Sequence, residues 1–339
     1  MNNLPKISIL IPTLNAAPFL EKCLKSVEKQ SYPKDKLEII VADGGSTDKT
    51  VEVAKKYKVL VCKNPLKTGE AGKAVALKHA KGDLIALIDS DNFLPDRSWL
   101  RRMVEPFSDK EVIGSEPWKF TYRRKDGFID RYSSLMGVND PLCYFLGNYD
   151  RLNVLSGKWT GLPVKQEDKG KWIKVELTTN ALPTIGANGT LMRKDILTKS
   201  KIIGDFLNDI DVIADLAKER PVKFAKVKMG IVHLYCGGDI LRFVRKQKRR
   251  IRDYLFYSKK GERSYPWKKQ SKTGILKFIL SCLLVIPLIY QSLKGYFKKP
   301  DMAWVFHLLA CWITLYIYTT EIIGSFFKVN QMTRKGWGQ

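Results

Sequence analysis

Acidic residues and histidine are scarce in this chain of 339 residues. Asp and Glu together number 34 against 59 Lys and Arg, there are 3 His, and the formal net charge is +25. So strong an excess of positive charge implies an anionic partner: nucleic acid, a phosphate-bearing substrate or an acidic membrane surface. With 45% hydrophobic residues, the chain can bury one large α/β domain plus an appendage, or two ordinary domains.

Paired cysteines, repeats, low-complexity tracts and an export signal are also missing. None of the six cysteines forms a Cys-x-x-Cys pair, and only Cys236 lies near a histidine, His233. We therefore expect buried thiols in a reducing compartment rather than a zinc site or a disulfide framework. The apolar run Ile7–Ile11 is too short for a signal peptide, so we expect the folded domain to stay in the cytosol.

The first hundred residues alternate short β-rich runs with segments of helical periodicity, which indicates βαβ units and a parallel sheet. In open sheets of this kind, ligands bind at the carboxyl ends of the strands, so the polar residues after each strand are the candidate site. The expected strands are Ile7–Ile11, Leu37–Val41, Val59–Val61 and Leu84–Ile88, and the expected helices are Phe19–Gln30, Thr47–Tyr57 and Gly72–Ala80.

The pattern is looser between Glu111 and about Ala181. Here the sequence predicts a helical stretch near Gly127–Leu146 and a long loop over Gly157–Lys174, and loops of that length are often functional. Regular structure is expected again at Leu191–Met192 and in a helix over Asp205–Lys218.

The segment Leu241–Thr273 carries 13 Lys or Arg against Asp253 and Glu262. Its apolar residues fall on one helical stripe (Leu241, Val244, Ile251 and Leu255). This is typical of a basic amphipathic helix on a membrane surface. A soluble helix that packs this stripe against the folded domain is the alternative.

Two long apolar segments follow, Ile275–Leu293 and Ala303–Phe327. The second exceeds the ~20 residues that cross the hydrocarbon of a bilayer. The first is shorter and contains Lys277 and Pro287, so it either crosses or lies in the interface. Lysines lie in the linker between the two segments and cations in the tail, so the positive-inside tendency alone does not orient a hairpin. Glu321 is expected near an interface.

Three acidic motifs lie where this architecture would place a site: Asp43-Gly44-Gly45-Ser46-Thr47-Asp48, Asp89-Ser90-Asp91 and Asn208-Asp209-Ile210-Asp211. The first allows a ligand close to the backbone, the second offers hard oxygen ligands for Mg²⁺ or Mn²⁺, and the third offers a general base. Alone, each also fits an ordinary structure: a capped β–α turn, a solvated acidic turn, or an acidic first helical turn.

In this order, the motifs resemble those of the inverting glycosyltransferases of family two, which have the GT-A fold. Pro12-Thr13-Leu14-Asn15 is similar to the family's opening turn, Asp43–Asp48 to its nucleotide loop, and Asp89-Ser90-Asp91 to its metal motif. Gly186-Ala187-Asn188-Gly189 resembles its acceptor turn, and Asp209 stands where its Glu-Asp motif places the base. The resemblance covers about residues 6–235.

The resemblance implies an α/β GT-A fold, a mostly parallel mixed sheet with helices on both faces, and a role for each matched residue. Asp209 would be the catalytic base and Asp91 the metal ligand. The implied donor-binding residues are Pro12, Thr13, Asn15, Asp43, Gly45, Lys73, Asp89 and Ser90, and those on the acceptor or sugar side are Ala187, Asn188, Gly189, Asp211, Gln247 and Arg250. Lys73 would touch a phosphate, although a surface lysine is equally compatible with its position.

Three departures from the family pattern matter. Asn208 replaces the usual Glu before Asp209, and Asp211 is a second acid there that leaves the base assignment open. In Gln247-Lys248-Arg249-Arg250, which is similar to the Gln-x-x-Arg-Trp motif of processive synthases, Ile251 replaces Trp, and two membrane segments argue against a polymer channel. His233 stands where relatives often have a metal-ligand His, but a lone His is more often structural.

The sequence therefore predicts a GT-A domain over 1–235, a basic interfacial helix region over 236–273, a membrane hairpin of two transmembrane segments over 274–330 and a short tail over 331–339. The expected reaction transfers one sugar from a UDP- or GDP-linked donor, with Mg²⁺ or Mn²⁺, to a polyprenyl-phosphate, lipid-linked or membrane-proximal acceptor. The catalytic domain would lie on the cytoplasmic face of an anionic membrane, without nucleic acid as a partner. A metal-dependent nucleotidyltransferase and a non-enzymatic membrane scaffold are the alternatives.

Overall fold

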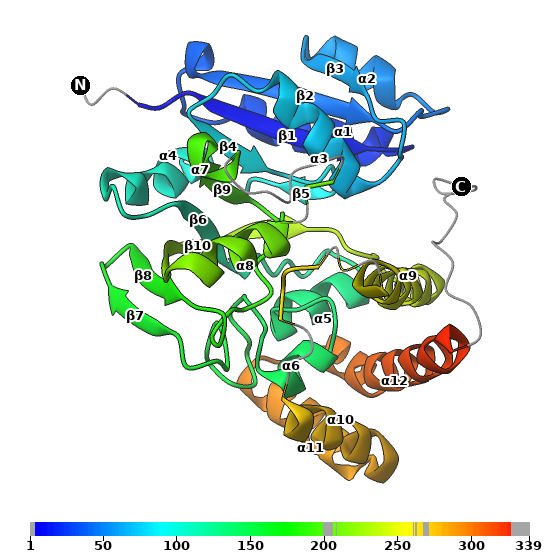
Figure 1. Ribbon diagram of the computed structural model, residues 1–339. Coiled ribbons are helices and arrows are strands. Elements are labelled where there is room, and N and C mark those ends of the chain that lie inside the picture. Colours follow the sequence, from blue (N-terminus) through cyan, green and yellow to red (C-terminus); the bar gives the residue numbers. More distant parts are fainter. Residues whose placement is uncertain are drawn as a thin grey trace.

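The chain folds around one mixed β-sheet, and the C-terminal part of the chain adds a group of helices (Figure 1). The computed structural model describes residues 4–198, 206–207, 209–259, 261, 263–266 and 271–326. The strand order is β3-β2-β1-β4-β9-β6-β10-β8-β7, and β5 pairs with β10 outside this path. The strands are β1 Ile7–Thr13, β2 Leu37–Asp43, β3 Leu60–Lys63, β4 Leu84–Leu87, β5 Asn92–Phe93, β6 Gly114–Phe120, β7 Lys165–Asp168, β8 Trp172–Leu177, β9 Thr190–Arg193 and β10 Val222–His233.

The first four strands form the parallel part of the sheet, as the sequence predicts. β1 is buried along its whole length because both faces of the sheet are covered. Ile7, Ile9 and Ile11 pack into the core on one face, and Leu10 packs into the core on the other. The carboxyl ends of β1, β2 and β4 therefore lie along one edge, where the acidic motifs begin.

Short helices cover both faces of the sheet. Residues of α1, α2 and α4 belong to the same core as Ile7, and residues of α3, α7 and α8 to the same core as Leu10. The helices are α1 Ala17–Glu28, α2 Thr50–Lys56, α3 Gly69–His79, α4 Trp99–Val104, α7 Lys194–Leu197 and α8 Asp209–Glu219, and short 3-10 helices occur at Lys34–Lys36, Glu105–Ser108 and Met302–Val305. Gly72 allows α3 to approach β1, since a Cβ there would lie 2.8 Å from the Cβ of Pro12.

The prediction of a loop over Gly157–Lys174 is wrong for the second half of that segment. β7 and β8 form an antiparallel hairpin at the edge of the sheet. All four residues of β7, Lys-Gln-Glu-Asp, are exposed, so the strand has none of the alternating apolar residues by which a strand is recognised in sequence. The predicted start of the helix at Asp205 lies outside the described residues.

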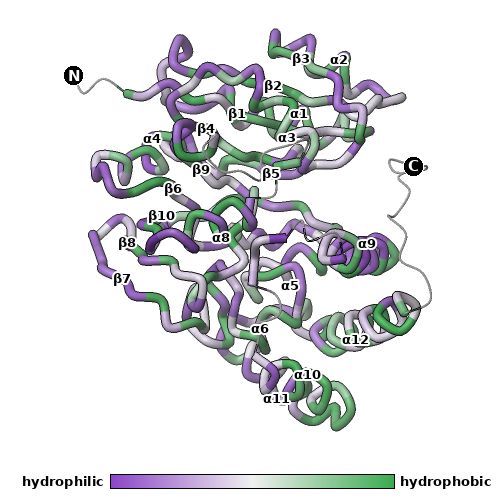
Figure 2. Tube along the Cα trace, in the orientation of Figure 1, coloured by the Kyte–Doolittle hydropathy of each residue, from purple (hydrophilic) through white to green (hydrophobic). Residues whose placement is uncertain are grey.

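The C-terminal helices pack on two further cores, away from the parallel strands (Figure 1). Figure 2 shows a hydrophilic α9 beside the more apolar α10, α11 and α12. The helices of this part are α5 Phe128–Met136, α6 Leu142–Leu146, α9 Ile240–Lys259, α10 Lys272–Leu284, α11 Ile286–Lys298 and α12 Phe306–Ser325.

The face that α9 buries differs from the predicted apolar stripe. Phe243, Gln247 and Ile251 are buried at four-residue spacing, whereas Leu241 is 71% exposed. Phe243 packs against Phe306 of α12, with ring centroids 5.2 Å apart. The basic helix therefore packs into the fold through one face, part of which α12 covers.

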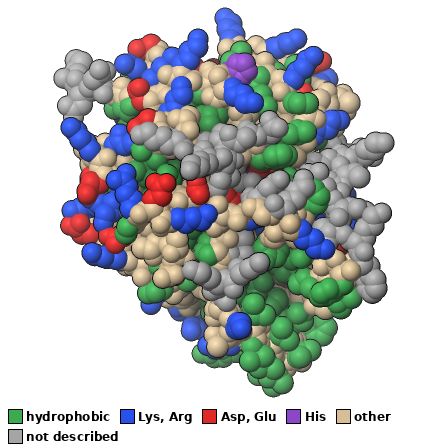
Figure 3. Space-filling view, viewed as in Figure 1, with side chains coloured by type: hydrophobic (Ala, Val, Ile, Leu, Met, Phe, Trp, Pro, Cys, Tyr) green, Lys and Arg blue, Asp and Glu red, His purple; other side chains and the backbone are tan. Residues whose placement is uncertain are grey.

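The two apolar segments differ in their geometry. Among the described residues, Met302–Ser325 is the one continuous helix long and apolar enough to cross a membrane. The helices α10 and α11 meet at Val285 with a bend of 95° and would amount to a span only if taken together. Apolar side chains gather over this lower end of the molecule (Figure 3).

Candidate active site

The loops after β1 and β2 are hydrogen-bonded to each other. The side-chain oxygen of Asn15 accepts a 2.7 Å bond from the backbone N–H of Thr47, and the Asn15 N–H donates a 2.8 Å bond to the Ser46 hydroxyl. Asn15 has a φ of 46°, in the left-handed region that asparagine tolerates better than most residues. These bonds join residues 31 and 32 positions apart in sequence, so the two motifs form one wall.

Asp43 stabilises the loop after β2 through hydrogen bonds to its backbone. Its carboxylate accepts hydrogen bonds from the backbone N–H groups of Gly45 (2.9 Å) and Ser46 (3.0 Å). Gly45 has a φ of 87°, which favours glycine. The structure therefore shows Asp43 and Gly45 shaping the loop, whereas Pro12, Thr13 and Asn15 line the cavity in front of it.

The Asp89-Ser90-Asp91 turn follows β4 and is fixed by the pairing of β5 with β10. His233 pairs with Asn92, and the N–H of Leu234 donates a 3.0 Å bond to the carbonyl of Asp91. This brings the Nε2 atom of His233 to 3.7 Å from the Asp91 carboxylate. His233 is 8% exposed, and its Nδ1 atom has no hydrogen-bond partner among the described residues.

This pair fits a divalent cation. A separation of 3.7 Å is too long for a hydrogen bond, but it suits two ligands of one ion whose metal–ligand bonds are about 2.1 Å long. Within the described residues, no group of three or more His, Cys, Asp and Glu could hold a metal, so Asp91 and His233 would supply only part of the coordination.

The electrostatic surroundings keep Asp91 ionised. Burial raises the pKa of Asp91, but the neighbouring His233 and the Lys246 ammonium, 3.8 Å away, lower it more, so that the pKa lies well below its usual range. Lys246 also donates a 2.7 Å bond to the carbonyl of Tyr235. The carboxylate is thus a permanent anion next to cations that belong to α9.

Asp209 begins α8 and lies beside Lys73 of α3. The Lys73 ammonium is 3.4 Å from Asp209 and 3.5 Å from Asp89, and it is almost fully buried. Lys73 is therefore not a surface lysine. Burial raises the pKa of Asp209 to about 6 although Lys73 lowers it, and one carboxylate oxygen has no partner among the described residues. These are the properties of a proton acceptor near neutral pH.

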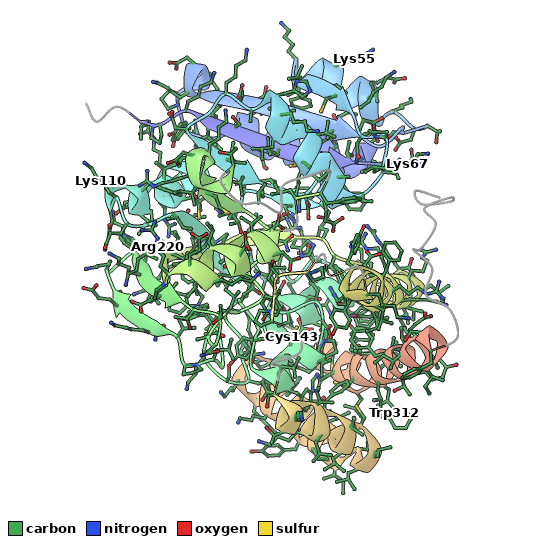
Figure 4. All side chains as sticks on the ribbon, viewed as in Figure 1. Lys55, Lys67, Lys110, Cys143, Arg220 and Trp312 are labelled. Carbon is green, nitrogen blue, oxygen red and sulfur yellow. The ribbon has the colours of Figure 1, made fainter. Side chains whose placement is uncertain are left out.

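A cavity of about 520 Å³ opens in front of these loops. We call it the donor cavity because Pro12, Thr13 and Asn15, which the sequence predicts to bind the donor, line it. Thr13 and Asn64 both line it, and each has a buried side-chain oxygen without a hydrogen-bond partner among the described residues. Five of its residues are cationic and two are acidic, so it suits an anionic ligand; Lys67 is labelled in Figure 4. The lining residues are Pro12, Thr13, Leu14, Asn15, Ala16, Phe19, Asn64, Lys67, Thr68, Gly69, Ser90, Asp91, Asp239, Arg242, Arg245, Lys246 and Arg249.

Asp211 does not reach this site. It is fully buried on α8, its carboxylate lies 2.7 Å from Arg263, and it accepts bonds from the N–H groups of Ser264 and Tyr265. These contacts attach the segment after α9 to helix α8 and so to the β-sheet core. Of the two acids that the sequence left as candidate bases, the geometry favours Asp209.

Gln247 and Arg250 also have structural partners. Gln247 donates a 2.9 Å bond to the carbonyl of Asn139 and accepts a 2.6 Å bond from Arg250, whose guanidinium is 3.8 Å from Asp140. Neither residue lines the donor cavity. Both therefore join α9 to the neighbouring loop, and their predicted role on the acceptor side stays a prediction.

The turn of Ala187, Asn188 and Gly189 lies at the end of β4, because the Gly189 N–H donates a 3.0 Å bond to the carbonyl of Leu87. Buried Arg151 donates a 3.1 Å bond to the Asn188 carbonyl. The turn adjoins the strand end that carries Asp89. None of its three residues lines the donor cavity.

Sequence reasoning missed the cations of α9 in the donor cavity. Arg242, Arg245, Lys246 and Arg249 are spaced by three and four residues, which places them on one helical face. That spacing was the available signal. The sequence predicts a membrane-facing charge cluster instead, because it does not show which way this helical face points.

Residues 8–160 match the family model described as glycosyl transferase family 2. The N-terminal part of the chain is a domain of this family. The predicted resemblance is thus confirmed, and the glycosyltransferase domain contains the β1, β2 and β4 loops of the site.

Curated relatives agree with this assignment. Glycosyltransferase AglE of Haloferax volcanii is 30% identical over 145 residues, which cover 40% of this chain and 47% of AglE. A dolichyl N-acetyl-α-D-glucosaminyl phosphate 3-β-D-2,3-diacetamido-2,3-dideoxy-β-D-glucuronosyltransferase of Methanococcus voltae is 34% identical over 108 residues, or 30% of this chain and 33% of that protein. The match thus spans less than half the length of either relative.

The fold is also found in a solved structure. A mannosyltransferase of Pyrobaculum calidifontis, in complex with GDP-Man and Mn²⁺, superposes with a TM-score of 0.53 at 16% identity, covering 94% of this chain and 88% of that one. At this identity the likeness concerns the fold alone. It confirms the predicted α/β fold of the glycosyltransferase domain.

Proposed function

We propose that the protein transfers a sugar from a nucleoside diphosphate donor to a lipid-linked or membrane-proximal acceptor hydroxyl, with inversion at the anomeric carbon. The observation that carries the proposal is the chain of contacts from Asp209 through Lys73 to Asp89, two residues before Asp91. It joins a candidate base to a candidate metal ligand across the end of one strand.

The donor cavity would hold the nucleotide. The unpartnered oxygens of Thr13 and Asn64 can accept hydrogen bonds from a base or a ribose, and the cations of α9 can neutralise a diphosphate. The mannosyltransferase with the similar fold is in complex with GDP-Man, which supports a nucleotide sugar as the ligand. A panel of nucleotide sugars distinguishes a UDP-linked from a GDP-linked donor.

We infer that Asp91 and His233 bind Mg²⁺ or Mn²⁺ together with the donor diphosphate. Carboxylate and imidazole both suit Mn²⁺, and the mannosyltransferase is in complex with that ion. Such an ion supplies Lewis-acid stabilisation of the negative charge on the leaving diphosphate. Lys246, beside Asp91, adds a positive charge from the protein itself.

Asp209 would accept the proton of the acceptor hydroxyl while its oxygen attacks the anomeric carbon. The new bond joins the acceptor oxygen to that carbon, and the bond to the diphosphate oxygen breaks on the opposite face. Lys73 keeps Asp209 and Asp89 in place through its two ion pairs, and Asp89 and Ser90 would contact the donor's ribose or sugar. The in-line geometry accounts for inversion.

The proposed acceptor is lipid-linked, because the name of the Methanococcus voltae relative specifies a dolichyl phosphate sugar and because the apolar helices lie in the same chain. The catalytic domain would work at the cytoplasmic face of an anionic membrane. A nucleotidyltransferase is not favoured, since such an enzyme would not need the Asp209 base and the family match is to glycosyltransferases.

The test is a panel of nucleotide sugars supplied to purified protein in detergent, with and without a polyprenyl phosphate. We expect release of UDP or GDP from one donor, stimulated by the lipid and abolished by a chelator. Release of pyrophosphate would instead support nucleotidyl transfer. Metal-independent turnover would contradict the assigned role of Asp91.

A further inference from the structure

Both ends of α12 are bonded to the body of the molecule. Just before α12, Asp301 forms a 3.0 Å ion pair with Arg131 of α5 and accepts a hydrogen bond from the Tyr122 hydroxyl. Near its other end, Glu321 pairs with Arg252 and with Lys248 of α9, the latter at 3.2 Å. Neither end is free to lie on the far side of a membrane.

The bent pair of α10 and α11 is attached at both ends as well. At its start, Gly274 packs so closely on α6 that an added Cβ would lie 2.6 Å from the carbonyl of Phe145. At its end, the Lys298 ammonium donates bonds to the carbonyls of Val154 (3.2 Å) and Leu155 (2.9 Å). The chain therefore returns to the glycosyltransferase domain after the bend.

A spanning hairpin conflicts with these contacts. The hydrocarbon of a bilayer is about 30 Å thick, so the linker around Pro300 would lie across it from the catalytic domain. In addition, α9 runs beside α12. The ring contact between Phe243 and Phe306 joins the two helices at one end, and the ion pair between Arg252 and Glu321 joins them further along. Helix α9 carries eight Lys or Arg. A spanning α12 would draw these charges into hydrocarbon, which is strongly unfavourable.

We propose that α10, α11 and α12 bind one leaflet and lie in its interface, so that the protein enters the membrane from one side only. Large apolar side chains project from all three helices: Leu283, Ile286, Phe297, Met302, Tyr316 and Phe326 are 67–82% exposed. Trp312, half exposed on the same helix as Tyr316, is labelled in Figure 4.

The occupant of this surface is a lipid leaflet rather than a protein partner. Exposed Lys272, Lys277 and Lys294 accompany the apolar side chains of α10 and α11, as expected where a helix meets anionic headgroups. The exposed apolar side chains come from three neighbouring helices, and apolar side chains gathered in this way mark a protein or membrane contact. The inference concerns how the chain is anchored and holds whatever sugar is transferred.

The first experiment locates the linker relative to the membrane. Purified Lys55→Cys, Pro300→Cys and Gly324→Cys variants are added to preformed liposomes and treated with a membrane-impermeant maleimide before and after detergent. All three positions are exposed, and Lys55 lies on the catalytic domain at the opposite end of the molecule from α10 and α11 (Figure 4). The wild type gives the background from native cysteines.

We expect Lys55→Cys to be labelled fully before detergent, and Pro300→Cys and Gly324→Cys to be labelled more slowly but only by reagent outside the liposomes, because both positions lie beside side chains that enter the outer leaflet. Labelling of Pro300→Cys by maleimide enclosed within the liposomes would mean that the linker has crossed and would overturn the proposal. Failure of the wild type to float with anionic liposomes would overturn it as well, because the surface would then not bind lipid.

The second experiment tests the apolar surface. The triple variant Ile286→Glu, Phe297→Glu and Tyr316→Glu should float with liposomes about tenfold less than the wild type, whereas Leu60→Glu, an exposed apolar residue on β3, should float normally. Donor turnover measured in detergent separates the proposed glycosyl transfer from the proposed membrane surface. A triple variant that turns over donor but does not float supports the surface, and normal flotation of that variant overturns it.

Discussion

Asp91 and Asp209 are both largely buried, with side chains 17% and 11% exposed, yet their surroundings shift their pKa values in opposite directions. Asp91 has His233 and Lys246 on one oxygen, and its pKa lies below the usual range. Asp209 shares the single ammonium of Lys73 with Asp89, and burial raises its pKa to about 6. The number of positive charges per carboxylate thus separates a permanent anion from a group that can exchange a proton.

Removing the permanent anion should have the largest effect. We expect Asp91→Asn to lower kcat/KM by roughly 10³-fold or more, because the cation loses its carboxylate ligand. Asp239→Asn, which removes the other acid of the donor cavity, should cost less than tenfold. Steady-state kinetics over a Mn²⁺ titration would check both, and an Asp91→Asn enzyme with normal metal dependence would refute the metal role.

Removing the proton acceptor should come next. Asp209→Asn is expected to lower kcat by roughly 10²–10⁴-fold with little change in the KM for the donor. Asp211→Asn is the matched control on the same helix: it breaks a buried ion pair with Arg263 and should lower the thermal midpoint more than it lowers kcat in folded protein. Equal kinetic losses in the two variants would leave Asp209 without a special role.

Lys73, which pairs with both Asp209 and Asp89, allows the role of Asp209 to be tested through the pH dependence of the reaction. Since Asp209 must be ionised to accept a proton, kcat/KM should fall about tenfold per pH unit below its pKa of about 6. Lys73 lowers that pKa, so Lys73→Met should move the acidic limb to higher pH. Lys78→Met, an exposed lysine on the same helix, should leave the limb in place. An unshifted limb in Lys73→Met would show that another group titrates.

The local parts of the site could be predicted from the sequence. The loops after β1, β2 and β4 follow strands with clear apolar runs, and their turn residues are readable from sequence alone. The resemblance points to His233 as a candidate metal ligand, but the residue pattern could not predict its contact with Asp91, because that contact depends on the pairing of β10 with the two-residue strand β5. Such a short strand has no periodicity. The orientation of α9 depends on the packing of Phe243 against α12, which is a tertiary contact.

The smallest expected effect concerns the two charged faces of α9. Arg245 lines the donor cavity, whereas Arg252 pairs with Glu321 of α12. Because Arg245 is largely exposed, its loss should raise the donor KM only a few-fold. Arg252→Gln should leave that KM unchanged and instead reduce the thermal midpoint in detergent. If both variants altered donor binding equally, the division of the helix between cavity and anchor would be wrong, and α9 would act as one undivided basic surface.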